Sequence, residues 1–98
     1  MSHYRFVVIE TFRNSGEPST SSIRCRPLPG QGFSTQMRVE CSSKMRDKYP
    51  VGTCFLIKTQ TIETDGGTTF LYTYYNWPYE VLSKREAQSR IANNKLSK

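Results

Sequence analysis

The chain has 98 residues, of which 36% are hydrophobic, 14 are lysine or arginine and 8 are aspartate or glutamate, giving a formal charge of +6. This length suits one small domain with a modest core and excludes a second domain or a large internal cavity. No apolar run approaches the roughly 20 residues of a membrane-spanning helix, and no signal-peptide core follows Met1. We therefore expect a single domain over residues 1–98, located in the cytoplasm and not in a membrane.

The positive charge is unevenly distributed along the chain. Residues 20–58 hold seven basic and two acidic residues, and residues 84–98 hold five basic residues and one acidic residue. A field polarised in this way attracts polyanions, whether nucleic acid, acidic protein or an anionic surface, and does not by itself select among them.

The first elements are predicted to be three β-strands. Residues 4–12 are rich in Phe, Val, Ile and Thr and are followed by a turn-forming cluster at 14–18. Residues 23–26 alternate apolar and basic side chains up to Pro27, which ends the strand because it has no amide hydrogen to donate. After an irregular loop the period-two alternation returns over residues 37–41.

A short helix and a hairpin are predicted next. Ser42 and Ser43 offer a capping hydroxyl before the helix-forming residues 44–48. Two β-rich runs, 53–62 and 68–75, then flank Asp65-Gly66-Gly67, where glycine makes the positive φ of a tight turn inexpensive.

The last element is predicted to be a helix that begins at Lys84. Ser83 and Glu86 have the spacing of a capping box, in which the serine hydroxyl and the glutamate carboxylate satisfy each other's backbone amides. Residues 93–98 are expected to fray.

This order of elements predicts a mainly β (α+β) domain. Five strands, a short helix between strands 3 and 4 and a C-terminal helix fit a small OB-like or SH3-like barrel, and an open α+β sheet fits nearly as well.

Catalytic and metal-binding patterns are weak in this sequence. His3 is the single histidine, and Cys25, Cys41 and Cys54 are widely spaced, so we interpret the cysteines as reduced core thiols and expect no metal, cofactor or disulfide framework. Glu40 and Asp47 are better explained as surface ion-pair partners than as an acid–base pair. We therefore expect a protein that is not an enzyme.

The pattern that stands out is basic and aromatic residues interleaved on strands. Arg24 and Arg26 project from one strand face, and Arg38 joins them if the second and third strands pair. If Leu71 points inward, the rings at 70, 72 and 74 point outward, although packing in the core of a small barrel is the favoured explanation of those rings. Cations that follow phosphates and rings that stack on bases are typical of single-strand binding.

We therefore predict a nucleic-acid-binding domain, for single strands and with weak sequence preference. The predicted contact residues are Arg24, Arg26, Arg38, Lys58, Tyr72 and Tyr74, with Lys84, Arg85 and Arg90 as a secondary electrostatic strip. The alternative is a small adaptor that binds a protein partner, or a second copy of itself, through a sheet edge or through a corner formed by Trp77 and Tyr79. For Trp77 itself, closing the end of a barrel is the favoured position.

Overall fold

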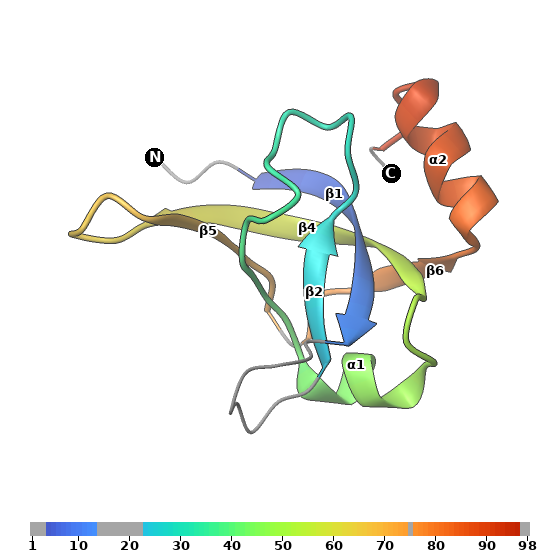
Figure 1. The fold of residues 1–98 in the computed structure, drawn as a ribbon, viewed down its shortest axis with the longest axis horizontal. Coiled ribbons are helices and arrows are strands. Elements are labelled where there is room, and N and C mark those ends of the chain that lie inside the picture. The colour runs from blue at the N-terminus through green and yellow to red at the C-terminus, as the bar shows by residue number, and fades with distance from the viewer. Residues whose placement is uncertain (1–3, 14–22, 75, 97–98) are drawn as a thin grey trace.

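The structure is a computed structural model, and it describes residues 4–13, 23–74 and 76–96. The elements are, in chain order, β1 (Tyr4–Arg13), β2 (Ile23–Pro27), β3 (Val39–Glu40), α1 (Ser43–Lys48), β4 (Cys54–Glu63), β5 (Thr69–Tyr72), β6 (Tyr79–Leu82) and α2 (Lys84–Ala92). The long strands β1 and β4 run through the middle of the molecule, with α2 on one side and α1 at one end (Figure 1).

The strands form one mixed sheet in the order β2-β1-β4-β5-β3. β1 pairs antiparallel with β2 and with β4, and β5 pairs antiparallel with β4 and parallel with β3. β6 pairs with β4 opposite Cys54–Ile57, whereas β5 lies opposite Gln60–Glu63 on the same edge. β5 and β6 are therefore two parts of one return strand, interrupted by residues 73–78.

Counted in this way, the barrel has five strands and is nearly closed. The remaining seam lies between β2 and β3, which form no ladder with each other among the described strands. Arg46 of α1 crosses toward this seam and donates a 2.8 Å hydrogen bond to the carbonyl of Ile23. The predicted mainly β fold, with a short helix between the third and fourth strands and a C-terminal helix, is confirmed. A partly open barrel of five strands corresponds to the OB-like layout.

The interior of the barrel is filled by side chains from most of its strands and from α1. Phe55 is its largest fully buried residue, and the rings of Tyr49 and Tyr79 pack edge-on against it at 5.4 and 5.6 Å between centroids. The buried members of this core are Val7, Ile9, Cys25, Val39, Met45, Phe55, Ile57 and Leu71.

A second core lies on the outer face of the sheet, beneath α2. Ala87 of this helix is fully buried there, and Ile91 packs against the same cluster. The buried members of the second core are Val8, Leu28, Cys54, Leu56, Leu82 and Ala87. β1 and β4 are thus covered on both faces, which explains the continuous apolar runs Val7–Ile9 and Cys54–Ile57 in place of strict alternation.

Two locally specified features are confirmed. The hairpin turns between β4 and β5, where Thr64 and Thr68 are joined by a 2.8 Å backbone hydrogen bond and Gly67 has a φ of +83°. At the start of α2, both hydrogen bonds of the capping box are present: the Ser83 hydroxyl accepts from the Glu86 amide, and the Ser83 amide donates to the Glu86 carboxylate.

The third strand differs from its prediction. β3 contains two residues and not five, and it pairs with β5, so the condition that β2 and β3 pair is not met: they share no ladder among the described strands. The reason is that the carbonyls of Arg38 and Glu40 accept hydrogen bonds from the amides of Leu71 and Thr73, both 3.0 Å long. The backbone carbonyls on this edge of β3 are therefore occupied by the return strand and not by β2.

Two smaller differences concern α1 and β6. The Ser42 hydroxyl makes no capping hydrogen bond at the start of α1, so that part of the prediction is wrong. The chain also returns to the sheet after the expected last strand, as β6, because Tyr79–Leu82 can pair with the free edge of β4 beyond the interruption.

A buried side chain extends the pairing of β1 beyond β2. The side-chain nitrogen of Gln31 donates to the carbonyls of Val8 and Leu28 at 2.8 and 2.9 Å, and its side-chain oxygen accepts from the backbone amide of Val8 at 2.7 Å. Gln31 therefore satisfies both backbone groups of a strand residue, as a neighbouring strand would, and fixes the loop after β2 to the sheet.

The remaining expectations concern the ends of the chain and the membrane. Residues 93–98 were expected to fray; there, Leu96 packs against the second core, and residues 97 and 98 lie outside the described part. The turn expected at 14–18 and the position of His3 also lie outside it. Within the described residues, no helix is both long enough and apolar enough to cross a membrane.

Candidate nucleic-acid interface

Three of the predicted contact residues line one groove. Arg24 and Arg26 lie on β2 on either side of the buried Cys25, so both project from the outer face, and Arg38 lies directly before β3. The groove has a volume of about 420 Å³, and we call it the arginine groove; its lining is Phe12, Arg24, Cys25, Arg26, Thr35, Gln36, Met37, Arg38, Val39, Glu40 and Arg46. Four guanidinium groups and one carboxylate line it, so its field is positive.

A buried carboxylate holds one wall of this groove. Glu10 on β1 receives Arg26 at 3.1 Å and Lys84 of α2 at 2.6 Å. Burial alone would raise the pKa of the Glu10 carboxyl, but the hydrogen bonds and charges of Lys84 and Arg26 outweigh it, so that this pKa lies below its ordinary value. Arg26 also stacks over the Phe12 ring at 4.6 Å, which fixes its guanidinium on the outer face.

The aromatic side chains of β5 point outward. Leu71 is fully buried in the barrel, and because side chains alternate along a strand, Phe70 and Tyr72 lie on the opposite face. Both rings are half-buried, and neither belongs to the barrel core. The outward orientation, and not the core alternative, is therefore the one observed.

This row of rings continues past the end of β5. Tyr72 contacts Tyr74 at 5.0 Å between ring centroids, Tyr74 contacts Trp77 at 4.7 Å, and Trp77 contacts Tyr4 of β1 at 5.6 Å, all edge-to-face. We call Phe70, Tyr72, Tyr74, Trp77 and Tyr4 the aromatic row. Its two most open members are Tyr4, 50% exposed, and Tyr74, 42% exposed.

Lys58 places a positive charge within the aromatic row. It projects from β4, and its ammonium lies 4.9 Å from the centre of the Tyr4 ring and 5.2 Å from that of Trp77. Such cation–π contacts orient the lysine along the rings while its charge stays partly in water.

Arg38 connects the groove to the row. Its guanidinium lies 4.5 Å from the centre of the Phe70 ring and 3.2 Å from the Glu40 carboxylate, while the same side chain lines the arginine groove. From Arg24 to Tyr4, each step is a contact or a shared lining, except the step from Phe70 to Tyr72, which are alternate residues on one face of β5. The structure thus brings all six of the primary predicted residues onto one continuous surface.

The secondary strip on α2 is divided. Lys84 is linked to Arg26 of the arginine groove through Glu10, but Lys84 and Glu10 themselves line a separate hollow beside α2. Arg90 forms a 2.7 Å ion pair with Glu80 of β6, and Arg85 is exposed and lines a shallow hollow together with Arg90. Arg85 and Arg90 therefore lie on the helix that covers β4 and β6, and not on β5, which carries Phe70 and Tyr72 of the aromatic row.

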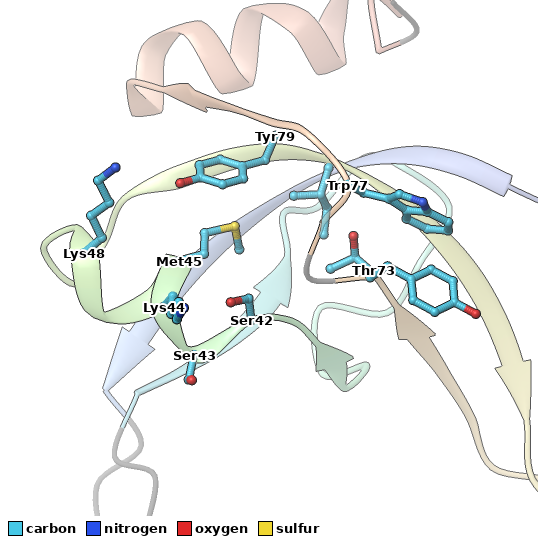
Figure 2. A pocket seen from close by; sticks show the side chains of 10 residues that line it. Ser42, Ser43, Lys44, Met45, Lys48, Thr73, Trp77 and Tyr79 are labelled. Carbon is cyan, nitrogen blue, oxygen red and sulfur yellow. The ribbon is translucent and has the colours of Figure 1, made fainter.

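The predicted partner corner borders a larger cavity. Trp77 and Tyr79 both line a cavity of about 560 Å³ between α1 and the segment 73–79. Figure 2 shows Met45 of α1 and Tyr79 of β6 directed toward the space between them. Tyr79, and not Trp77, packs against the barrel core, whereas Trp77 is half-buried in the aromatic row.

Sequence reasoning missed several members of this surface. Tyr4, Phe12 and Phe70 were not among the predicted contacts, although Phe70 was recognised as outward-facing if Leu71 was buried. No local signal marks Tyr4 or Phe12, because their positions depend on the register of β1 with β2 and β4.

The described residues contain no cluster that could hold a metal ion. Within residues 4–13, 23–74 and 76–96, no three of the His, Cys, Asp and Glu side chains come close enough to hold a metal ion. Cys54 is fully buried beneath α2, and its pKa is raised by burial.

Comparisons of this chain with protein-family models, with curated proteins and with solved structures find no match.

Proposed function

We propose that this domain binds single-stranded nucleic acid along the surface formed by the arginine groove and the aromatic row. One observation carries the proposal. Among the described residues, four large hydrophobic side chains are exposed, and two of them, Tyr4 and Tyr74, both contact Trp77. Exposed rings gathered in this way, beside a lysine and a groove lined by arginines, are costly to leave in water unless they meet a ligand.

The chemistry of the surface suits a strand whose bases are unpaired. Rings on which bases stack contribute about 1–3 kcal/mol per base in single-strand-binding proteins, whereas the bases of a duplex are already stacked on one another. Arg24, Arg26 and Arg38 would follow the phosphates at one end, and Lys58 would neutralise a phosphate beside the rings. Stacking accepts every base, so sequence preference would be weak.

The test is a fluorescence-anisotropy titration of the purified protein with labelled single-stranded and duplex DNA and RNA at about 50 and 200 mM salt. We expect saturable binding that prefers single strands and weakens as salt rises, because bound cations release counterions from the phosphates. No binding at the lower salt, or equal binding of duplex and single strand, would overturn the proposal.

Two variants separate stacking from general surface effects. Tyr74→Ala should weaken single-strand binding roughly 5- to 100-fold, the equivalent of one stacked base. Val81→Ala is the matched control, since Val81 is also 42% exposed but lies on β6 outside the aromatic row. Equal losses in the two variants would argue against stacking.

A second function, binding of a protein partner, is favoured by the cavity between α1 and residues 73–79. Trp77 and Tyr79 line it together, and aromatic side chains at a pocket are frequent anchors of protein interfaces. If the partner is a second copy of the chain, sedimentation at rising protein concentration should show the dimer. In that case association should change little between about 50 and 200 mM salt, in contrast to nucleic-acid binding.

A further inference from the structure

Two of the three cysteines meet at the seam of the barrel. Cys25 lies in the middle of β2, and Cys41 directly follows β3, 16 positions later in the chain. Their sulfur atoms are 2.9 Å apart. Both cysteines are free thiols in this structure, as is Cys54.

We infer that Cys25 and Cys41 form a reversible disulfide that closes the barrel between β2 and β3. The sulfur atoms need to approach by only about 0.9 Å to reach the bond length of about 2.05 Å. In the order β2-β1-β4-β5-β3, the two end strands β2 and β3 share no ladder among the described residues, and the bond would join them. The disulfide would close, by a covalent bond, the seam between β2 and β3 that backbone hydrogen bonds leave open.

The surroundings of the two sulfurs favour one of them as the nucleophile. The hydrogen bond from Cys25 lowers the pKa of the Cys41 thiol, and the charge of Arg46 acts in the same direction. The same hydrogen bond raises the pKa of Cys25, and burial adds to this effect. Cys41 is also the more accessible of the two, since it is half-buried whereas Cys25 is 5% exposed. A more acidic and more accessible thiol is the one that reacts first.

The oxidant would be a small-molecule disulfide such as oxidised glutathione, acting by thiol–disulfide exchange. The Cys41 thiolate attacks one sulfur of the oxidant, the oxidant's disulfide bond breaks, and one thiol leaves. Cys25 then loses its proton and attacks the Cys41 sulfur of this mixed disulfide, which releases the second thiol. The two cysteines lose two electrons, the oxidant gains them, and the two protons end on the two released thiols.

The test treats the reduced full-length protein with oxidised glutathione, alkylates the remaining thiols and measures the intact mass and the tryptic peptides. Arg38 lies between Cys25 and Cys41, and Lys48 lies between Cys41 and Cys54, so trypsin places the three cysteines on separate peptides. We expect one cross-link, between the Cys25 and Cys41 peptides, with Cys54 alkylated. The cross-linked protein should be about 2 Da lighter than the reduced chain before alkylation, and dithiothreitol should restore it.

Cys54 provides the matched control. Cys54→Ala removes a cysteine that is fully buried beneath α2, so this variant should keep the cross-link, whereas Cys41→Ala should lose it. Cross-linking should also raise Tm by roughly 5 °C or more, because the bond restricts the unfolded chain. This mapping on the unaltered protein requires no variant to fold.

Three results would overturn the inference. One is a lasting glutathione adduct on Cys41 without closure, which would mean that Cys25 cannot reach it. Another is a mixture of linkages that includes Cys54. The third is full alkylation of Cys25 and Cys41 after a treatment that oxidises the urea-unfolded chain.

Discussion

At the scale of single residues, Glu10 connects parts of the chain that are distant in sequence. Its carboxylate on β1 binds Arg26 of β2 and Lys84 of α2, and its side chain is only 12% exposed. It therefore joins the sheet, the C-terminal helix and one wall of the arginine groove. Removing the carboxylate would leave two cations facing each other across a partly dry site.

Glu10→Gln should lower the free energy of unfolding by about 1–3 kcal/mol at pH 7, because charged hydrogen bonds are lost. The folded protein holds the Glu10 pKa below its ordinary value of 4.5, so this stabilisation is complete above that pH. It should disappear as the pH falls through the lowered pKa of the folded state. Urea unfolding of both proteins from pH 7 to pH 3 measures this. A difference that grew toward low pH would contradict the role assigned to Glu10.

Gln31 offers a second test at this scale, one that does not involve charge. Gln31→Ala removes three hydrogen bonds to the backbone and leaves the buried Val8 amide without this acceptor, while the Val8 carbonyl keeps the Leu28 amide at 3.1 Å. We expect a loss of roughly 2–4 kcal/mol in the free energy of unfolding. Gln36→Ala, in the same loop but exposed, is the control and should stay within about 0.5 kcal/mol of the parent.

At the scale of elements, the two helices begin in different ways. α2 has a complete capping box at Ser83, whereas Ser42 precedes α1 without a side-chain cap. The shorter helix is instead held by tertiary contacts: Met45 is buried in the barrel core, and Arg46 binds the Ile23 carbonyl.

This contrast predicts different outcomes for the same substitution. Ser83→Ala should reduce the free energy of unfolding by about 1 kcal/mol, because the Glu86 amide loses its acceptor. Ser42→Ala should have an effect within about 0.5 kcal/mol, the usual range for a surface change without a specific partner. Thermal unfolding followed by circular dichroism compares the two, and equal effects would refute the assignment of the caps.

The elements that sequence reasoning placed correctly are those specified within a few residues. Asp65-Gly66-Gly67 marks a turn by its backbone freedom, Pro27 ends a strand by lacking a donor, and Ser83 with Glu86 starts a helix. The outward orientation of Tyr72 and Tyr74 follows from parity only once Leu71 is known to be buried, and the sequence alone favours core packing of these rings.

Other features depend on contacts between distant segments and could not be predicted. The pairing of β3 with β5 in place of β2 uses the backbone carbonyls of Arg38 and Glu40. Every residue has a backbone carbonyl, so the sequence does not indicate which strand these two will pair with. The meeting of Tyr4 with Trp77, and of Cys25 with Cys41, requires the complete barrel. The sequence therefore indicated candidate residues that share one strand, such as Arg24 and Arg26. It did not indicate contacts between strands that are distant in the chain, such as that of Tyr4 with Trp77.

At the scale of the whole molecule, charge and aromatic surface are combined on one continuous surface. The arginine groove lies at the β2–β3 seam, and the aromatic row extends from β5 across residues 74–77 to β1. Arg38 belongs to both parts. A strand bound along this surface would therefore engage phosphate contacts and stacking contacts at once.

Arg24→Gln tests the electrostatic part of this surface. The variant should bind single strands more weakly at every salt concentration, and the slope of log K against log salt should fall by about 0.7, the equivalent of one phosphate contact. Arg85→Gln is the matched control on α2, where it should change the slope less. An unchanged slope for Arg24→Gln would place the phosphates elsewhere.

The most direct measurement of the central claim uses the single tryptophan of the chain. Trp77 lies within the aromatic row, between Tyr74 and Tyr4, so a base that stacks there alters its fluorescence. Titration with an unlabelled single-stranded oligonucleotide should quench this emission in a saturable way, with a midpoint that matches the anisotropy titration and moves to higher concentration in Arg24→Gln. Unchanged Trp77 emission at saturating oligonucleotide would contradict the account, because it would show that the strand does not reach the row.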